Sequence, residues 1–180
     1  MQFLQLQMHY VINLTPSPKS FAMYKLTTSF PYILNRVGVR MGDLFADRLA
    51  ADELSLNMYR ALAALWERGE QKLSELSEFT SVELSTLSRM VGTLKQRGLV
   101  IRRRPEGNTR TVEIALTPQG RRLVEKYITP AELYEEIALH GFTPDEVADL
   151  KKKLHRIYKN LDIIEVNLSG KADLSRGLKS

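Results

Sequence analysis

The chain has 180 residues, with 26 lysines and arginines, 21 acidic residues, no cysteine and a net charge of +5. The lack of cysteine excludes disulfides, thiolate metal sites and thiol-based redox sensing. No stretch of about twenty apolar residues is present. We therefore expect no membrane-spanning helix and a soluble, cytoplasmic protein.

Residues 1–25 are expected to form a poorly ordered N-terminal extension. Apolar and polar residues alternate from Leu4 to Leu14, a period that also suits a strand paired with another subunit. No basic residue precedes the apolar run, which argues against a secretory signal. Met23 is an alternative natural start.

A long helix is expected from about residue 29 to 51. Ser29 can cap it, and Pro31 falls in its first turn, where a missing N–H is harmless. Gly38 and Gly42 lie one turn apart and permit close backbone approach. The apolar positions exceed one narrow face, which predicts a partner, either a second subunit or the rest of the chain. These positions are Phe30, Ile33, Leu34, Val37, Val39, Met41, Leu44 and Phe45.

Two shorter helices are expected at 56–68, capped by Ser55, and at 73–79. Residues 80–83 then form a turn into a third helix. The order short helix, turn, long helix predicts a helix-turn-helix. The side chains expected to face inward are Leu56, Tyr59, Leu62, Ala63, Trp66, Leu73, Leu76 and Phe79.

The third helix starts near Leu84 and ends at Gly98, a residue type common at helix C-termini. Leu84, Leu87, Val91 and Leu94 recur at helical spacing and predict a buried face. The opposite face has hydroxyl groups, an amide and an arginine but no acid, which suits a DNA major groove. Its residues are Ser85, Thr86, Ser88, Arg89, Thr93 and Gln96.

Two β-rich runs follow, 99–104 and 110–116, and predict a hairpin. Between Leu84 and Arg122 there are nine lysines and arginines against two acids, whereas residues 31–83 contain six against nine. The basic excess therefore lies on the third helix and the hairpin, and predicts a winged helix-turn-helix that binds nucleic acid. The alternative is an ordinary α+β fragment whose three consecutive arginines are a solvated strand end.

After the hairpin, Thr117 and Pro118 open a helix that Pro130 is expected to kink or break. Thr143-Pro-Asp-Glu146 is a capping box for a final helix through about Asp162. A frayed tail is expected from Ser169. The final helix is expected to bury Val147, Leu150, Leu154, Ile157, Tyr158 and Leu161. Its cations, Lys151, Lys152, Lys153 and Arg156, suggest either a second nucleic-acid site or, as we prefer, a solvated face.

Several short motifs occur in a fixed order: Leu-Ser-Glu-Leu at 73–76, Ser-Thr-Leu-Ser-Arg at 85–89, Leu-Lys-Gln-Arg-Gly-Leu-Val at 94–100, and Val-Glu-Ile-Ala-Leu-Thr-Pro-Gln-Gly at 112–120. From about Leu26 to Asp162 the chain resembles the MarR (multiple antibiotic resistance regulator) family of bacterial transcription factors. Phe-Pro-Tyr-Ile-Leu-Asn-Arg-Val-Gly-Val-Arg at 30–40 also looks like the first helix of a MarR subgroup.

The resemblance implies a mainly α fold with a small β-hairpin wing. Residues 55–119 would form the winged helix-turn-helix DNA-binding domain. Residues 26–54 and 120–165 would form a helical dimerisation region, and 166–180 a C-terminal tail. A homodimer would then bind an inverted repeat in double-stranded DNA, and repression is favoured because most of the family represses.

Within this resemblance Arg89 suits a guanine, and Thr93 and Lys95 suit phosphates. Arg102 to Arg104 add phosphate attraction, although some must point inward along the strand. At the wing tip the family commonly has Asp-x-Arg, whereas this chain has Asn108 in place of the aspartate. The neutral amide of Asn108 can hold Arg110 only through a weaker acceptor than a charged carboxylate. The expected DNA contacts are Ser85, Thr86, Ser88, Arg89, Thr93, Lys95, Arg102, Arg104, Asn108 and Arg110.

Family members often release DNA when a small anionic aromatic molecule binds between the dimerisation helices and the DNA-binding lobe. The resemblance therefore implies such an effector, with Arg36, Arg40 or Arg60 as its cationic partner. The competing interpretation is that most of the candidates are core residues. The candidates are Phe30, Leu34, Val37, Met41, Met58, Tyr59, Arg60 and Trp66.

No cofactor or metal is expected, because His9, His140 and His155 show no ligand spacing. An enzyme is not expected either, because the chain has no glycine-rich phosphate loop and no nucleophile elbow. Two alternatives remain: a winged-helix protein-interaction module, and a DNA-binding regulator without an effector.

Overall fold

The computed structural model describes the backbone of residues 25–104 and 112–177 and the side chains of these residues up to Leu161. The predictions for the N-terminal extension, for Met23 as the start, and for Asn108 and Arg110 lie outside the described residues. The chain divides into two compact units, Met1–Val124 and Glu125–Ser180. Each unit is described by itself.

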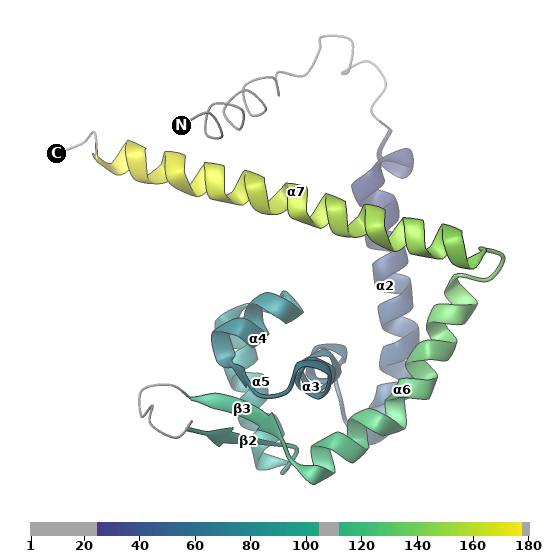
Figure 1. Cartoon of the computed structure of the whole chain (residues 1–180), viewed down its shortest axis with the longest axis vertical. Helices are drawn as coiled ribbons and strands as arrows, with labels where there is room; N and C mark the ends of the chain where they lie inside the picture. Colours follow the sequence, from purple (N-terminus) through teal and green to yellow (C-terminus); the bar gives the residue numbers. More distant parts are fainter. Residues whose placement is uncertain (1–24, 105–111, 178–180) are drawn as a thin grey trace, which may run out of the picture. The chain divides into compact units, whose positions relative to one another are not determined.

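The fold is mainly α-helical with a small antiparallel sheet, as predicted (Figure 1). In chain order the elements are η2 (Leu26–Thr28), α2 (Phe30–Leu49), η3 (Ala50–Asp52), α3 (Leu56–Arg68), β1 (Gln71–Lys72), α4 (Leu73–Thr80), α5 (Leu84–Gln96), β2 (Val100–Arg103), β3 (Glu113–Leu116), α6 (Pro118–Ala138) and α7 (Pro144–Gly177).

The core of the first unit lies among α3, α4, α5 and the sheet. Leu62, Leu76, Leu87 and Leu94 are completely buried, at 0% exposed. Full burial of a leucine side chain contributes about 1.5–3 kcal/mol relative to exposure, so these four hold the three helices together. The other large side chains that are fully buried are Leu49, Val91, Val100, Ile114 and Val124.

Three residues expected in this core are exposed instead: Trp66, Phe79 and Leu84. The buried face of α3 is centred on Leu62 and Leu65, which turns Trp66 outward. Phe79 is covered on one side by the guanidinium of Arg68, 4.4 Å from the ring centroid. Leu84 is the first residue of α5, before the helix enters the core. Leu56, Tyr59, Ala63 and Leu73 are half-buried.

The sheet has three strands in the order β1-β3-β2. The pair β2 and β3 is the predicted hairpin, with Arg102 opposite Ile114 and Arg103 opposite Glu113. Strand β1 was not predicted, because two residues show no alternation of apolar and polar side chains. It exists through its pairing with β3, where Gln71 lies opposite Ile114.

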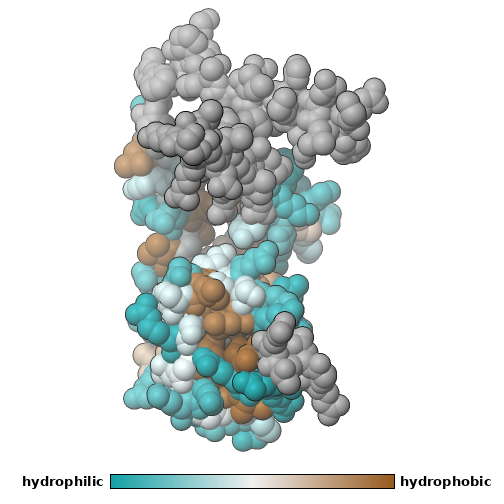
Figure 2. Space-filling model, turned by 90° about the vertical axis from the view of Figure 1, so that its left-hand side faces the viewer, coloured by the Kyte–Doolittle hydropathy of each residue, from teal (hydrophilic) through white to brown (hydrophobic). Residues whose placement is uncertain are grey.

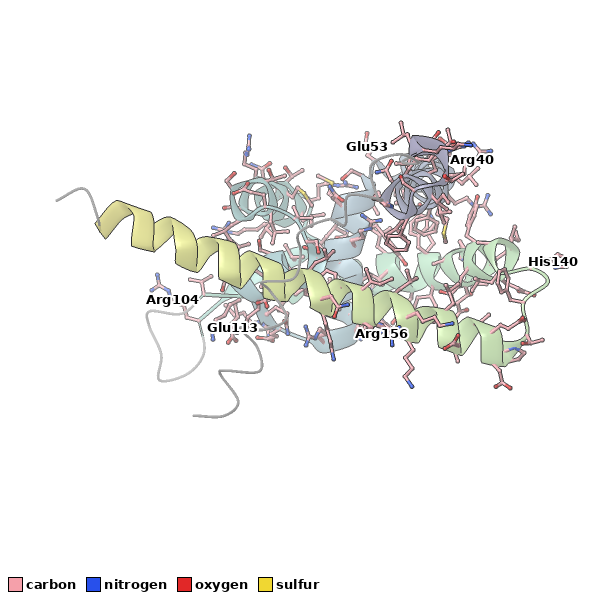
Figure 3. The ribbon with its side chains drawn as sticks, turned by 90° about the horizontal axis from the view of Figure 1, so that it is seen from above. Arg40, Glu53, Arg104, Glu113, His140 and Arg156 are labelled. Carbon is pink, nitrogen blue, oxygen red and sulfur yellow. The ribbon has the colours of Figure 1, made fainter. Side chains whose placement is uncertain are left out.

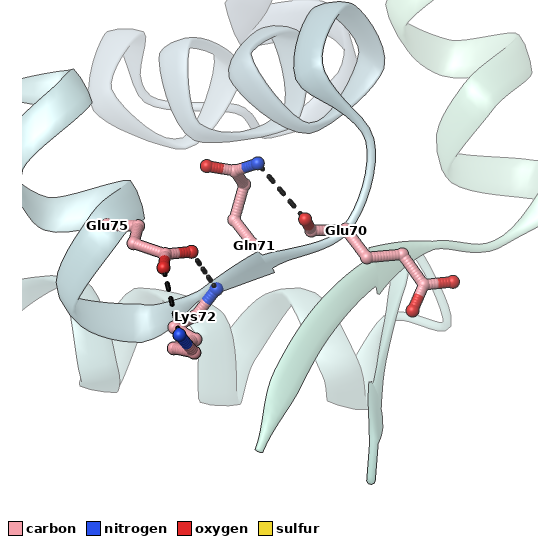
Figure 4. Close-up of polar contacts among 4 residues, drawn as sticks. All are labelled: Glu70, Gln71, Lys72 and Glu75. Atoms are coloured by element: carbon pink, nitrogen blue, oxygen red, sulfur yellow. Dashed lines mark hydrogen bonds and ion pairs between the residues drawn. The ribbon is translucent and has the colours of Figure 1, made fainter. Parts of the chain in front are cut away.

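Local side-chain hydrogen bonds define several helix starts. Ser55 Oγ accepts from the Met58 N–H at 3.2 Å, as predicted. Ser29 occupies the N-cap position of α2, but it makes no capping bond; its hydroxyl donates to the Leu26 carbonyl at 2.8 Å. Lys72 stands where a capping hydroxyl is usual. There the Glu75 carboxylate accepts from the Lys72 backbone N–H and from its ammonium, both at 3.1 Å (Figure 4).

The helices after the hairpin differ from the prediction at Pro130 and at the C-terminus. Helix α6 begins at Pro118 as expected but continues through Pro130 to Ala138, so the expected break is wrong. A proline removes one N–H from the helix ladder, and the hydrogen bonds on either side can maintain the helix. The capping box is confirmed, because Thr143 and Glu146 bond reciprocally. Helix α7 then extends to Gly177, which replaces the frayed tail expected from Ser169.

Two helices bury much less apolar surface than expected. In α2 only Phe45 and Leu49 are buried. The predicted buried stripe of α7 is half-buried or exposed, with Tyr158 and Leu161 more than half exposed. The neighbour of Gly42 is a side chain rather than the expected backbone, because a Cβ there would lie 3.0 Å from Leu56 Cδ2, and Gly38 faces open space.

Candidate nucleic-acid interface

The polar face of α5 is exposed, as the sequence predicts. Ser85, Thr86, Arg89, Thr93 and Lys95 are all exposed. Ser88 is half-buried. The opposite face, with Leu87, Val91 and Leu94, is anchored in the core. A helix held firmly on one side and exposing hydroxyl and guanidinium groups on the other can be inserted into a major groove.

An acidic residue at the start of α5 was not predicted to be part of this site. Glu83 is the N-cap, and its carboxylate accepts the backbone N–H groups of Ser85 and Thr86, each at 2.9 Å. It also accepts the hydroxyl of Ser85. These bonds, first that of the Ser85 side chain and then those of the backbone, lower the pKa of Glu83 to about 2.

The Glu83 cap has a consequence for DNA contacts. The hydroxyl hydrogen of Ser85 is donated to the carboxylate, so only the oxygen lone pairs of Ser85 remain for a base. The sequence could have revealed this cap. Glu83 stands directly before the first residue of the helix, and its carboxylate can reach the backbone N–H groups two and three residues later.

The arginines of β2 are not equivalent. Arg103 forms an ion pair with Glu70 at 2.8 Å, so part of its charge is neutralised within the unit. Arg102 and Arg104 are exposed. Figure 3 shows Arg104 just after β2 and Glu113 at the start of β3. All three arginines are exposed, and the charge of Arg103 is paired with that of Glu70.

A further arginine in the basic segment is used inside the protein. Arg97, the C-cap of α5, donates to the backbone carbonyls of Glu53 at 2.9 Å and Asp52 at 2.6 Å. Arg97 is one of the nine lysines and arginines between Leu84 and Arg122. Its guanidinium is half-buried and already bound, so we remove it from the cations available to DNA.

A surface depression of about 400 Å³ lies along α2. It includes Val37 and Met41 from the expected effector set, together with the two cations Arg36 and Arg40. The Arg36 guanidinium lies 5.8 Å from the ring centroid of Tyr32. The lining residues are Thr27, Tyr32, Ile33, Arg36, Val37, Arg40 and Met41.

The other effector candidates are not among these lining residues. Met58 and Tyr59 are half-buried on α3, Arg60 is exposed, and burial raises the pKa of the Tyr59 hydroxyl. The interpretation that most candidates are core residues is wrong for the described chain. The exposed candidates are Phe30 at 50%, Leu34 at 42%, Val37 at 52%, Met41 at 39% and Trp66 at 39%.

The lysines of α7 pair with acids nearby, which supports the solvated-face interpretation. Lys151 bonds Glu135 at 2.6 Å, and Lys153 bonds Asp149 at 2.5 Å. Among the described residues no group of histidines and acids could hold a metal ion; His140 lies in the turn between α6 and α7 (Figure 3). No helix in the described part of the chain is long and apolar enough to cross a membrane.

Comparison with known proteins agrees with this geometry. The family model described as MarR family matches residues 54–112, which span α3 to the start of the wing's second strand. A MarR-family regulator from Silicibacter pomeroyi has 29% sequence identity and a TM-score of 0.69; the match covers 76% of this chain and 92% of that one. Residues 54–112 therefore match the MarR family, and the chain shares the fold of MarR-family regulators.

The curated relatives of this chain are transcriptional regulators. The HTH-type transcriptional repressor IacR of Pseudomonas putida is 27% identical over 136 residues, 75% of this chain and 81% of that protein. The curated relatives are covered over 64% to 95% of their length. The chain is therefore a DNA-binding transcriptional regulator rather than an enzyme, as predicted.

The fold is also shared with BpsR of Bordetella bronchiseptica, whose DNA binding is described as regulated by 6-hydroxynicotinic acid. That structure has 24% identity and a TM-score of 0.69, and the match covers 76% of this chain and 98% of that chain. At this identity the likeness concerns the fold.

Proposed function

We propose that this MarR-family regulator acts as a homodimeric repressor, binds an inverted-repeat operator through α5 and the wing, and is released by a small anionic aromatic effector. The observation that supports DNA recognition best is the exposed polar face of α5, with Arg89 and Lys95, followed by the exposed arginines of β2. IacR, a named repressor, provides the reason to favour repression.

The homodimer is supported by the apolar surface of α2. Ile33, Val37 and Leu44 are each more than a third exposed, on a helix that buries only its C-terminal end. Contiguous exposed apolar surface of this kind marks a protein interface. A two-fold dimer of winged helices would present two copies of α5 to DNA, which is why we propose an inverted repeat.

The proposed domain division follows from the same surfaces. Residues 55–119 would bind DNA, and 26–54 with 120–165 would pair the two subunits. On the face drawn in Figure 2, apolar residues are exposed among hydrophilic ones. In the helix-turn-helix itself the exposed apolar side chains of α4 and α5 are Phe79 and Leu84.

The effector class is supported by the α2 depression, where Arg36 and Arg40 lie beside Tyr32, Val37 and Met41. Two guanidinium groups next to an aromatic ring and aliphatic side chains suit a flat carboxylate. The ligand described for BpsR, 6-hydroxynicotinic acid, belongs to this chemical class. We therefore propose aromatic carboxylates as the first compounds to screen by thermal shift.

The test of DNA recognition is selection of duplexes from a random pool by the wild-type protein. The selected duplex should contain an inverted repeat, and Arg89→Ala should weaken its binding by about 1–3 kcal/mol. Affinity should fall by roughly a thousandfold or more between 50 and 200 mM salt if several phosphates are contacted. Failure to enrich any duplex, or nearly flat salt dependence, would favour the protein-interaction alternative.

A further inference from the structure

The C-terminal end of α5 is tied to the turn between α2 and α3 by one side chain. Arg97 Nη1 donates to the Glu53 carbonyl at 2.9 Å, and Nη2 donates to the Asp52 carbonyl at 2.6 Å. The planar guanidinium holds both bonds at once, which restricts its orientation more than a single bond would. Arg97 thus connects the end of α5 to two residues that precede it by 44 and 45 positions in the sequence.

The turn that accepts these bonds is itself well determined. Glu53 is a non-glycine residue with φ 50° and ψ 36°, in the left-handed region. Its N–H bonds to Ala50 O at 3.0 Å, and the Leu54 N–H bonds to Leu49 O at 3.2 Å. Leu49 and Leu54 are buried. A left-handed residue persists only where its surroundings determine it, so the two carbonyls have a stable position.

The end of α5 is closed by its own backbone. The Arg97 N–H bonds to Thr93 O, and the Leu99 N–H bonds to Leu94 O, both at 3.0 Å, while Gly98 has φ 70°. The side chain of Arg97 extends from this end of α5 to the Asp52–Glu53 turn. Glu53 lies near α2 in Figure 3.

We propose that Arg97 is a positioning residue, which sets the angle of α5 on DNA by anchoring its C-terminal end to the Asp52–Glu53 turn, and that it does not contact phosphate. This inference rests on the proposed role of α5 in base recognition. Base contacts need α5 in one orientation, whereas phosphate attraction depends mainly on charge. Loss of the anchor therefore lowers specificity more than general DNA affinity.

The experiment compares Arg97→Gln with wild type on the selected duplex and on a scrambled duplex of equal length, at several salt concentrations. We expect Arg97→Gln to raise the Kd for the selected duplex about tenfold and to leave the Kd for the scrambled duplex within about twofold. The slope of log affinity against log salt should match that of wild type, because no phosphate contact is lost.

Two control variants separate positioning from charge. Lys95→Gln, an exposed candidate phosphate contact on α5, should lower the salt slope by about 0.9 and weaken both duplexes. Arg156→Gln removes one charge on α7, shown in Figure 3, and should leave the ratio of the two Kd values unchanged. If Arg97→Gln behaves as Lys95→Gln does, or keeps the wild-type ratio, the inference is overturned.

The two proposals fail in different ways. If wild-type protein does not prefer the selected duplex, the proposed function fails and the variant adds nothing to that result. If Arg97→Gln does not fold by circular dichroism, the comparison is made with Arg97→Lys, which keeps the charge but has no planar pair of donors. If Arg97→Lys prefers the selected duplex less than wild type does, the inference is supported. If its preference equals that of wild type, the inference is overturned.

Discussion

At the scale of single residues, the DNA-binding face depends on an acid that the composition of α5 does not show. Glu83 satisfies two N–H groups at the start of the helix, which otherwise have no intrahelical partner. Its negative charge also interacts favourably with the positive end of the helix dipole. A carboxylate therefore orders the first turn of a helix that is proposed to approach a polyanion.

This cap predicts a pH-dependent stability difference. The pKa of Glu83 is lowered from 4.5 to about 2, so its stabilisation is present above pH 4.5 and is lost as the pH falls through about 2. Glu83→Gln should lower the thermal midpoint at pH 7, and the difference from wild type should disappear near pH 2. Exposed Glu67→Gln on α3 is the control. A difference that persists unchanged to pH 2 would contradict the role of the carboxylate.

At the scale of elements, the start of α6 packs closely against the turn between α5 and β2. The Thr117 hydroxyl donates to the Gly98 carbonyl at 2.6 Å, and Thr117 Oγ1 accepts from the Gly120 N–H at 3.0 Å. Gly120 is buried, and a Cβ there would lie 2.0 Å from the Leu99 carbonyl oxygen. The start of α6 can approach the turn between α5 and β2 only because residue 120 has no side chain.

Gly120→Ala is therefore expected to destabilise the protein by about 1–3 kcal/mol, since backbone atoms must move to relieve the overlap. Urea unfolding followed by circular dichroism measures this change. Gly92→Ala in α5 is the matched control, because nothing lies within 4 Å of its added Cβ. Gly92→Ala should raise the free energy of unfolding by up to about 1 kcal/mol, because alanine has a higher helix propensity than glycine. Equal effects of the two substitutions would refute this account of the close approach.

At the scale of the whole molecule, the unburied apolar face of α2 predicts self-association. Val37 is 52% exposed, so a charge there should disturb a subunit interface without disturbing the fold of one chain. We expect wild-type protein to have twice the chain mass of 20.6 kDa by light scattering, and Val37→Asp to shift toward the single-chain mass with an unchanged circular dichroism spectrum.

Asn35→Asp is the matched control for this prediction. It places the same charge at an exposed position of α2 outside the apolar stripe, and it should remain dimeric. A wild-type monomer, or a Val37→Asp variant that stays dimeric at low micromolar concentration, would rule out this face as the subunit interface.

The amino-acid sequence by itself determined the features that depend on neighbours within a few residues. Helical spacing located α3, α4 and α5, Ser55 and Thr143 marked helix starts, and the hairpin followed from two β-rich runs. The basic helix and strand together were enough to predict a DNA-binding winged helix. These features are local because hydrogen bonds three or four residues apart and the period of side chains create them.

Only the tertiary structure decided what contacts between distant residues create. It added β1 to the sheet, paired Arg103 with Glu70, and committed Arg97 to the Asp52–Glu53 turn. It also showed that Leu84 and the α2 stripe are exposed. A count of charges does not distinguish an exposed arginine from one that is bound within the protein. A helical period does not show which apolar residues are covered. Which groups are satisfied or covered depends on segments tens of residues away, and the chain must fold before they meet.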